Sequence, residues 1–566
     1  MFNFELYKEG LRKTKTLGIL FIIGMLLGSI TQPLLGIISW MNGIRGGWIT
    51  TGSLMHVRGI EASYMMLFAP FAGAPVITLS MFSFLNKRSS SDFYHALPHK
   101  RETLFGSFIA AILTWVVGGM WLSTMVSVII YAISPYTIVN MGSIILAVLG
   151  MSAASFLVVA ATALAITITG NTLSNIVASG LILFLPRILI SMFVSMVVEM
   201  TLVVNSADFG LLGNHHYNIV IGIFIAIFAG VPTGNMFTIG TFYTLILGIL
   251  YMVAAGIIFK KRRSEIAGNS GSKFIQPTIR IMVTFAITLI AILMIFNLSD
   301  DHDYRISRVF QIEGIIVVYI IAAFSYFVYE FLTTKRIPKL IKMIPGLLIV
   351  AALNIIFIVG INISRNVILQ EVNVSDIRSV TIVELHDRWG ALTFVELNMR
   401  RVDITDNEIT EILGETLNNN IRRVVERGRQ STAGHRVRVI FNIEGGRNIT
   451  RSVWVRSLSE LNNLLSEYEP YQEIFMRMPE NPDQLFIWGN EESLTQEQLH
   501  HIYNVLYEEV AELSFSEWHE ANERMMGSRW HFIEVNCSNY RSTFPIIEEL
   551  TPQTYELLTS YLENED

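Results

Sequence analysis

Long runs of apolar residues, separated by short polar stretches, fill the first two thirds of the chain. Because a transmembrane helix needs about 20 mostly apolar residues, each long run is a candidate span. Nine runs qualify, at residues 17–40, 64–85, 104–132, 143–169, 176–203, 241–259, 281–296, 314–332 and 344–363. A tenth run, at 219–231, is too short to span comfortably. The pattern predicts an α-helical polytopic membrane protein.

Basic residues orient these spans, since the cytoplasmic loops of membrane proteins are rich in Lys and Arg. With nine spans and a cytoplasmic N-terminus, four basic clusters fall in the cytoplasm, at residues 8–15, 87–101, 260–280 and 335–342. If 219–231 also crossed the bilayer, the third cluster would face outward. We therefore interpret residues 208–240 as a re-entrant feature of the outer leaflet, shielded by neighbouring helices. An odd number of spans then places the C-terminal region outside the cell.

The apolar runs stop near Ser364, and the balance of charge changes there. Residues before Ser364 include 23 Lys and Arg against 13 Asp and Glu, whereas the rest of the chain has 18 against 34. Such a break indicates a domain boundary. The sequence therefore predicts a basic membrane domain, with an interfacial amphipathic helix at 1–16, and an acidic extracellular α+β domain at 365–566. The division of the nine spans into a six-span core at 17–268 and three additional transmembrane helices at 269–364 is what a family resemblance implies, which residues 91–105, 170–173 and 259–268 carry.

The C-terminal region has the alternating and capped patterns of a water-soluble α+β domain. Strands are predicted at 379–385, 391–397, 436–443, 448–455 and 530–535, and helices at 406–427, 458–468 and 495–513. Asp406 is the expected N-cap of the first helix, and Ser457 and Glu460 form a capping box. The Glu-Gly-Gly-Arg sequence at 444–447 indicates a hairpin. No catalytic signature is present, so we expect either binding of a cationic or amphiphilic ligand, or gating, or a purely architectural role.

The N-terminal segment before the first span is amphipathic. Phe2, Phe4, Leu6, Tyr7 and Leu11 alternate with charged residues. This pattern predicts a short helix on the inner leaflet, with its cations on the lipid headgroups. The alternative is a frayed, merely basic N-terminus.

The loop between the second and third spans has a pattern typical of a partner site. It contains, in order, Ser91, Asp92, Phe93, Tyr94, His95, Ala96, Leu97 and Pro98. Ser91 or Asp92 is a good N-cap, and Pro98 would stop the helix. Phe93, Tyr94 and Leu97 would then form one exposed apolar face, which usually marks a partner site. The alternative is a re-entry loop whose aromatic rings rest among the lipid headgroups.

This octapeptide, with the Lys100-Arg101-Glu102-Thr103-Leu104-Phe105 that follows, resembles the first cytoplasmic loop of ABC permeases of the type-2 exporter family, in the Gram-positive group with a C-terminal extracellular extension. Residues 259–268 and Gly170-Asn171-Thr172-Leu173 are similar to that group as well. The resemblance covers residues 1 to about 268 and is looser beyond. It implies that 1–16 is an interfacial elbow helix, that 91–98 is the ATPase-coupling helix, that 17–268 is a permease core, and that 208–240 forms short outer re-entrant helices.

The resemblance also implies partners. These are an ABC ATP-binding subunit on the cytoplasmic face, a second permease in a homodimer or heterodimer, and the lipid bilayer, with no nucleic acid. The chain has no Gly-x-x-x-x-Gly-Lys-Ser/Thr motif, so ATP and Mg would be bound by the partner ATPase and not by this chain. We therefore expect no cofactor and no enzymatic activity in this chain. The expected substrate is an amphiphile, such as an antimicrobial peptide or a lipid.

A membrane sensor is the alternative function. Its extracellular domain would bind a ligand and signal across the bilayer, and no ATPase would co-purify. An intramembrane enzyme is disfavoured because the predicted spans lack paired catalytic residues.

Two charged residues within the predicted spans are further candidates. Arg187 follows Pro186 in the middle of a span, and Glu199 lies twelve residues later. Charges in lipid are costly, so they either line a transport pathway or pair with a neighbouring helix or loop. The adjacent histidine pairs at 215–216 and 500–501 diverge on regular structure, and we predict no metal site.

Overall fold

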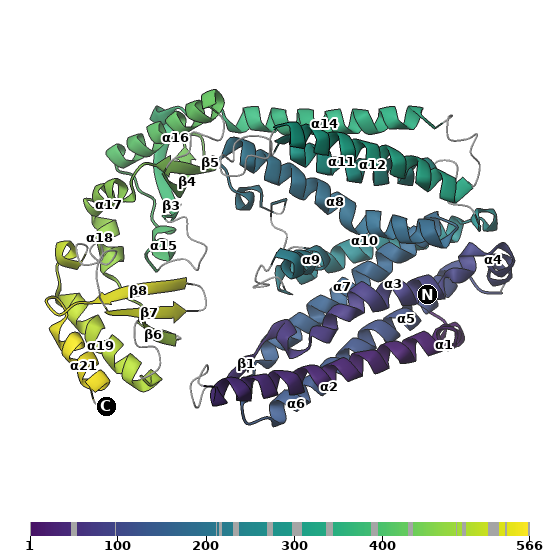
Figure 1. Ribbon diagram of the computed structural model, residues 1–566, viewed down its shortest axis with the longest axis horizontal. Helices are drawn as coiled ribbons and strands as arrows, with labels where there is room; N and C mark the ends of the chain where they lie inside the picture. Colours follow the sequence, from purple (N-terminus) through teal and green to yellow (C-terminus); the bar gives the residue numbers. More distant parts are fainter. Residues whose placement is uncertain are drawn as a thin grey trace. The chain divides into compact units, whose positions relative to one another are not determined.

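The computed structural model describes residues 2–46, 54–96, 98–210, 212–213, 218–229, 237–268, 275–296, 308–334, 343–385, 394–427, 434–480, 482, 484–488, 494–518, 531–537 and 540–563. The chain forms two compact units. The first contains Met1–Met196 and Phe209–Ile361, and the second contains Val197–Asp208 and Asn362–Asp566. The chain passes from one unit to the other inside two helices, α8 (Thr172–Thr201) and α14 (Pro345–Ile368), and in the loop after α8 (Figure 1).

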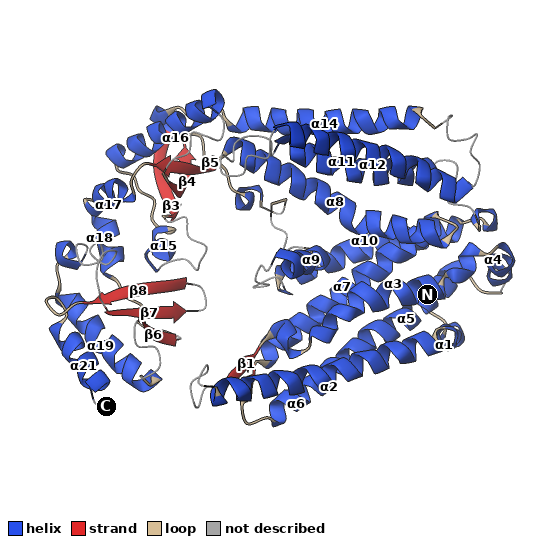
Figure 2. Ribbon diagram, viewed as in Figure 1, coloured by secondary structure: helices blue, strands red, loops and turns tan. Residues whose placement is uncertain are grey.

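Helices make up almost all of the described part of the first unit (Figure 2). Besides α8 and α14, its helices are α1 (Phe4–Lys13), α2 (Lys15–Arg45), α3 (Ala74–Met81), α4 (Arg88–His95), α5 (Arg101–Leu113), α6 (Gly119–Ile133), α7 (Met141–Ile168), α9 (Ile219–Ala229), α10 (Ile239–Lys261), α11 (Ile275–Phe296) and α12 (Arg308–Thr334). A short parallel pair joins β1 (Met55–Val57) to β2 (Thr137–Val139). π-helical turns at Ala69–Gly73 and Thr114–Gly118 run into α3 and α6.

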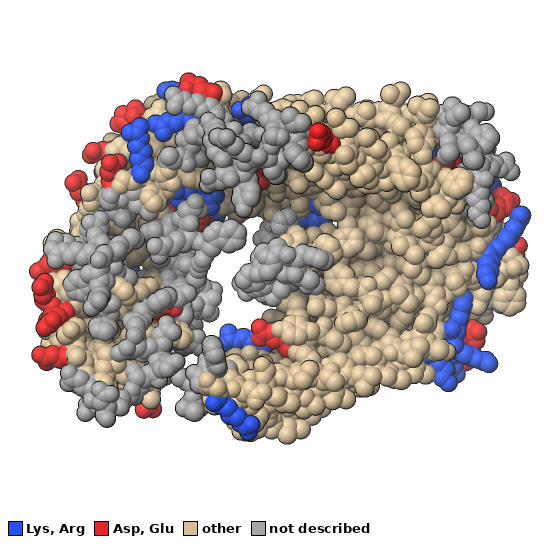
Figure 3. All heavy atoms as spheres, in the orientation of Figure 1, with Lys and Arg blue, Asp and Glu red and all other residues tan. Residues whose placement is uncertain are grey.

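In the part of the chain that the structure describes, nine helices are long and apolar enough to cross a membrane. Each of them overlaps one of the nine apolar runs of the sequence. On the face shown in Figure 3, the surface of these helices is largely free of charged atoms. The chain is therefore a polytopic helical membrane protein, whereas the number of crossings and their direction stay predictions.

The helix α9 corresponds to the tenth apolar run. Its 11 residues rise only about 16 Å, which is roughly half of a bilayer core. Ile219, Val220 and Ile223 are buried, and α9 packs against α7 and α10. The amide of Ile219 donates to Thr244 Oγ1 at 3.1 Å. A helix of this length, held by protein on one side, fits the re-entrant interpretation of 208–240, of which residues 211, 214–217 and 230–236 lie outside the described part.

Burial separates the central helix of this unit from its peripheral ones. In its most apolar stretch α7 is 72% buried, whereas α2 and α14 are each 17% buried. Gly248 of α10 allows that helix to pack closely against α7, because a Cβ at this position would lie 2.7 Å from the ring of Phe156 in α7. Helices such as α2 and α14 instead expose large apolar side chains, as a lipid-facing helix does.

The second unit contains two antiparallel sheets, each with its own apolar core. One sheet has the order β3 (Ile377–Glu384), β4 (His435–Ile443), β5 (Arg447–Val455), and the other has the order β6 (Gln484–Trp488), β7 (His531–Cys537), β8 (Tyr540–Ile546). Its helices are α15 (Phe394–Met399), α16 (Asn407–Arg427), α17 (Leu458–Ser466), α18 (Glu469–Met476), α19 (Gln496–Glu512) and α21 (Pro552–Glu563). This region is α+β, as its sequence predicts.

Local signals in this unit are mostly confirmed. Asp406 Oδ1 accepts from the amides of Glu408 and Ile409, which makes it the N-cap of α16. The hairpin between β4 and β5 turns at Gly445 and Gly446, whose φ angles of +91° and +78° favour glycine. The helix predicted at 458–468 ends earlier, at Ser466, and α18 follows after a turn.

One strand prediction is wrong. The segment 391–397 is not a strand, because residues from Phe394 onward form the helix α15, while 391–393 lie outside the described residues. Met399 of α15 is fully buried in the core around β3. A short apolar run fits a buried helix as well as a strand, and tertiary packing decided between them. The sequence also did not predict β6, β8 or α21.

Candidate functional site

The octapeptide singled out in the sequence lies on α4 and just after it. The helix begins at Arg88, three residues before Ser91, so the prediction that Ser91 or Asp92 caps it is wrong. Lys87 is the N-cap, because the chain leaves the 3₁₀ turn Ser83–Asn86 in an extended conformation there. Ser91 is fully buried on the inner side of the helix, and Asp92 is exposed.

The C-terminal end of α4 agrees with the expected stop. The helix ends at His95, and the amide of Ala96 donates to Asp92 O at 3.0 Å. Pro98 follows shortly after, where a proline disfavours further helix. Leu97 and the side chain of His95 lie outside the described residues.

The two aromatic residues of α4 have different environments. Phe93 is 63% exposed, which makes it a large apolar group on the surface of the helix. Tyr94 is half-buried, and its ring centroid lies 4.2 Å from that of Phe84 and 6.0 Å from that of Phe108. Neighbouring residues on a helix point in different directions. The prediction that Phe93 and Tyr94 share one exposed face is therefore wrong, and of these two rings Phe93 is the one that is mostly exposed.

Lys13, at the end of α1, contacts the inner side of α4. Its ammonium group lies 4.5 Å from the ring of Phe84 and 4.6 Å from that of Tyr94, and it donates to Met81 O at 2.9 Å. Burial lowers the pKa of Lys13 to about 8. The sequence assigned this lysine to the lipid headgroups, whereas the structure places it in an aromatic cluster that joins α1, α4 and α5.

The N-terminal helix is present as predicted. Asn3 caps α1 by accepting from the amides of Glu5 and Leu6, and the Asn3 amide donates to Ser107 Oγ of α5 at 3.0 Å. Leu6 is buried, while Phe2 and Phe4 are each 58% exposed. The helix therefore packs one face against α5 and presents aromatic rings on another.

Basic residues at the end of α10 and directly after it tie that helix to the start of α5. Arg262 is 2% exposed and donates to Ile166 O at the end of α7 and to Leu85 O at 2.9 Å. Burial lowers the pKa of Arg262 to about 10. Arg101 of α5 donates to Arg262 O at 2.7 Å, and Lys260 pairs with Glu102 at 2.5 Å.

A polar network connects the same region to the start of α8. Asn175 Nδ2 donates to Asn86 Oδ1 at 3.1 Å, and Thr169 Oγ1 donates to Asn175 Oδ1. The amide of Gly268 donates to Gly170 O at 2.8 Å. The three segments that carry the family resemblance, at 91–105, 170–173 and 259–268, therefore lie beside one another, where α5 and α8 begin and α10 ends.

Arg187 and Glu199 both lie on α8, as predicted. Arg187 is 9% exposed and Glu199 is half-buried. Twelve residues of α-helix rise about 18 Å, so these two side chains do not pair with each other. Arg187 belongs to the first unit and Glu199 to the second.

The sequence analysis missed a buried ion pair in the first unit. Arg280 of α11 and Glu330 of α12 lie 2.6 Å apart, at 3% and 1% exposure. The guanidinium also lies 4.4 Å from the ring of Tyr326. The sequence analysis placed Arg280 in a cytoplasmic basic cluster and did not single out Glu330, which lies inside the predicted span 314–332. Opposite charges at the ends of neighbouring predicted spans were the available signal.

The last turn of α8 and the segment after it belong to the second unit. The Trp454 indole N–H donates to Leu202 O at 2.9 Å, and the Ser452 amide donates to Val203 O at 2.7 Å. Val203 is fully buried in the core of the first sheet of this unit. Because β5 is an edge strand, these bonds cover part of its free edge.

An ion pair fixes the end of the same segment. Arg438 of β4 donates to Asp208 Oδ1 from Nε at 3.1 Å and from Nη2 at 2.5 Å. Asp208 Oδ2 accepts from the Asn205 amide at 2.7 Å. The two charged side chains are only 16% and 8% exposed, so the pair is largely shielded from water.

Metal chemistry finds no support in the described residues, where no group of three or more His, Cys, Asp or Glu side chains could hold an ion. His500 contacts Gln496 O and His501 contacts Tyr561 OH, so this pair diverges as expected. The pair at 215–216 lies outside the described part. Comparison of the chain with protein-family models, with curated proteins and with solved structures finds no match.

Proposed function

We propose that the chain is the membrane-spanning permease subunit of an ABC exporter, and that α4 docks on a separate ATP-binding subunit in the cytoplasm. The observation that carries the proposal is the position of Phe93. It is 63% exposed on a helix whose other side buries Ser91 and packs Tyr94 against Phe84. An exposed aromatic anchor on a rigid support is typical of the centre of a protein–protein interface.

The packing of α4 suits the transmission of movement. A force on Phe93 would reach α1 through Lys13, and it would reach α5 through the contact of Tyr94 with Phe108. ATP and Mg would be bound by the partner, and the work would be done on helices of this chain. A second permease copy, in a homodimer or a heterodimer, would complete the pathway for an amphiphilic substrate. In this proposal the second unit lies outside the cell.

The test is purification of the tagged full chain from its native membrane, followed by measurement of bound ATPase. We expect Phe93→Ala to weaken the ATPase interaction about 30-fold, since a good aromatic anchor contributes about 2 kcal/mol. The matched control is Tyr94→Phe, which keeps the ring against Phe84 and leaves Phe93 in place. It should retain the wild-type amount of ATPase.

Two results would count against the proposal. One is full ATPase binding and full ATP-driven transport by the Phe93→Ala variant. The other is the absence of any nucleotide-binding protein from the purified wild-type complex.

A membrane sensor is the second candidate, and a different observation supports it. Trp454, Ser452 and Arg438 of the second unit hold the segment that directly follows α8, so a ligand-driven change in that unit could reach α8, most of which belongs to the first unit. A sensor needs no ATPase. Purification of the wild-type chain without a nucleotide-binding partner would therefore favour it.

A further inference from the structure

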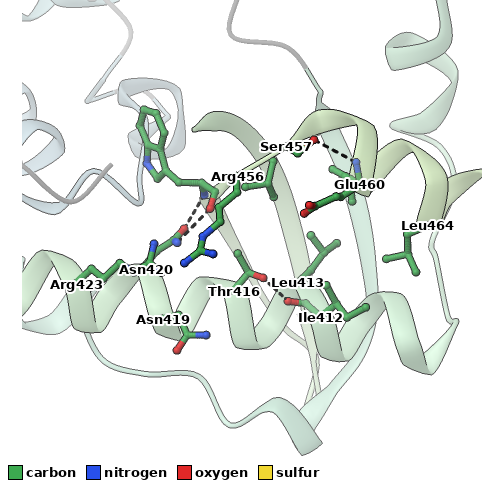
Figure 4. Close-up of a pocket in the computed structure, with 13 residues that line it drawn as sticks. Ile412, Leu413, Thr416, Asn419, Asn420, Arg423, Arg456, Ser457, Glu460 and Leu464 are labelled. Atoms are coloured by element: carbon green, nitrogen blue, oxygen red, sulfur yellow. Dashed lines mark hydrogen bonds between the residues drawn. The ribbon is translucent and has the colours of Figure 1, made fainter. Parts of the chain in front are cut away.

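A cleft of about 450 Å³ lies in the second unit, between α16 and the end of β5 with the start of α17 (Figure 4). This volume is in the range of sites that hold small organic molecules, about 300–1,000 Å³. All of its lining residues belong to one unit, so the cleft is formed within a single packed body.

The two ends of the cleft differ in chemistry. At one end lie the apolar side chains of Ile412, Leu413 and Leu464, with the Glu460 carboxylate at the rim (Figure 4). At the other end lie the guanidinium-bearing residues and amides: Arg423, Asn419, Asn420 and Arg456. A cleft with an apolar end and a cationic end is complementary to an amphiphile with an anionic head.

The two arginines of the cleft have no ion-pair partner in the part of the chain that the structure describes. Their neighbour Arg422 differs: it makes a bidentate pair with Glu371, at 2.8 and 2.7 Å, and does not line the cleft. Arg423 and Arg456 are thus available to a ligand. In a region with 34 acidic residues against 18 basic ones, two such arginines at one cleft are a local exception.

The cleft is not suited to an added peptide strand. Trp454 on the edge strand β5 has its amide and its carbonyl occupied by the side chain of Asn420, at 2.6 and 3.2 Å. Two residues earlier, the Ser452 amide is bonded to Val203 O. Strand addition requires free backbone groups on an edge, so these bonds favour a small ligand over an extended peptide.

We propose that this cleft binds a small single-chain amphiphile with an anionic head group. The head lies beside Arg456 and Arg423, and the tail lies on Ile412 and Leu464. Arginine is suited to this role because its planar guanidinium donates two hydrogen bonds to one carboxylate. The cleft fits an anionic head group better than the cationic ligand that the acidity of this region suggests, because two of its three charged side chains, Arg423 and Arg456, are positive and Glu460 is negative.

The test uses the full chain in phosphatidylcholine nanodiscs and octanoate as the probe. Calorimetric titration, with empty nanodiscs subtracted, should show one saturable site whose affinity falls as salt rises. Loss of a charge-assisted hydrogen bond predicts about tenfold weaker binding for Arg456→Gln and for Arg423→Gln. Thr416→Phe, which fills the middle of the cleft, should abolish binding.

The matched control is Arg422→Gln, an identical change one residue away that leaves the cleft intact and should bind octanoate like the wild type. Thermal unfolding of each variant establishes that it is folded. Equal weakening by Arg422→Gln, or no saturable site beyond empty nanodiscs, would overturn the proposal. So would tighter binding of octyltrimethylammonium than of octanoate. The experiment measures octanoate binding alone, so a negative result would contradict the proposed cleft ligand without bearing on the proposed transport function.

Discussion

Single residues near α4 combine charge and aromatic packing in a way that fixes the geometry of that helix. Lys13 is surrounded by the rings of Phe84, Tyr94 and Phe108, each within 6 Å of its ammonium group. Cations over aromatic faces are attracted by the ring quadrupole, more strongly when water is excluded. This attraction and the bond to Met81 O offset part of the cost of burying the charge, and below pH 8 the lysine keeps its proton.

The depressed pKa of Lys13 predicts a pH dependence of stability. The folded pKa is about 8 and the ordinary value is 10.5, so between these pH values the unfolded chain binds more protons. The contribution of Lys13 to stability therefore rises from pH 8 toward 10.5. In thermal unfolding of the full chain, the stability of the wild type relative to Lys13→Met should increase from pH 8 to pH 9.5.

Lys8→Met is the matched control for this experiment. Lys8 lies on the same helix, but it is 55% exposed and pairs with Glu5 on the surface. The difference in stability between Lys8→Met and the wild type should not change over the same pH window. A difference between wild type and Lys13→Met that stays constant from pH 7 to 9.5 would contradict the assignment.

At the scale of elements, α8 has an unusual end. Leu202 closes it with a φ of +57°, a left-handed conformation that costs a non-glycine residue about 1 kcal/mol. The conformation persists because Leu202 O accepts from the Trp454 indole and the next residue is bonded to β5. Strand β5 and Asp208 thus determine how the chain leaves α8.

Removing the ion pair at the end of this segment should loosen it. Arg438→Met leaves the Asp208 carboxylate shielded from water without its main partner, which costs about 3 kcal/mol for a buried pair. We expect hydrogen exchange at the Ser452 amide, now protected by Val203 O, to accelerate on the order of 100-fold.

An exposed pair in the same sheet provides the control. Arg378 and Glu444 lie 3.2 Å apart, but they are 64% and 66% exposed. Exposed pairs contribute about 1 kcal/mol or less, so Arg378→Met should leave exchange at Ser452 near the wild-type rate. Equal protection of Ser452 in both variants would show that the ion pair does not hold the segment.

At the scale of the whole molecule, the helical unit separates apolar surface from charge. Its long helices carry large exposed apolar side chains, whereas Arg101, Lys260 and Arg262 gather where α5 begins and α10 ends. Positive charge at one end of a set of spans is typical of the cytoplasmic side. This arrangement supports the proposed orientation.

Cysteine labelling tests the orientation in intact cells. The only native cysteine, Cys537, is first replaced by serine. Gln553→Cys, at an exposed position of the second unit, should react with a membrane-impermeant maleimide in intact cells. Ser89→Cys, exposed on α4, should react only after the membrane is permeabilised. The opposite pattern would reverse the orientation, and labelling of both from outside would rule out an odd number of crossings between α4 and the second unit.

Much of the fold could be predicted from the sequence because its signals are local. Apolar runs of about 20 residues are visible without neighbours, and so are the Asp406 cap and the Gly445-Gly446 turn. The sequence pattern located the candidate site on α4, but it did not predict which side chains of that helix are exposed. Whether Tyr94 points outward with Phe93 or inward to Phe84 depends on the position of another helix, which periodicity does not encode.

The sequence by itself determined that this is a polytopic helical chain with an acidic α+β region, since the solvent around each segment dictates its composition. Tertiary structure alone decided the pairings of distant charges. Arg438 lies 230 residues from Asp208, and Arg280 lies 50 residues from Glu330. Such pairs form because folding brings two charges together away from water, where each needs a partner. That requirement is set by position in space, which no local pattern records.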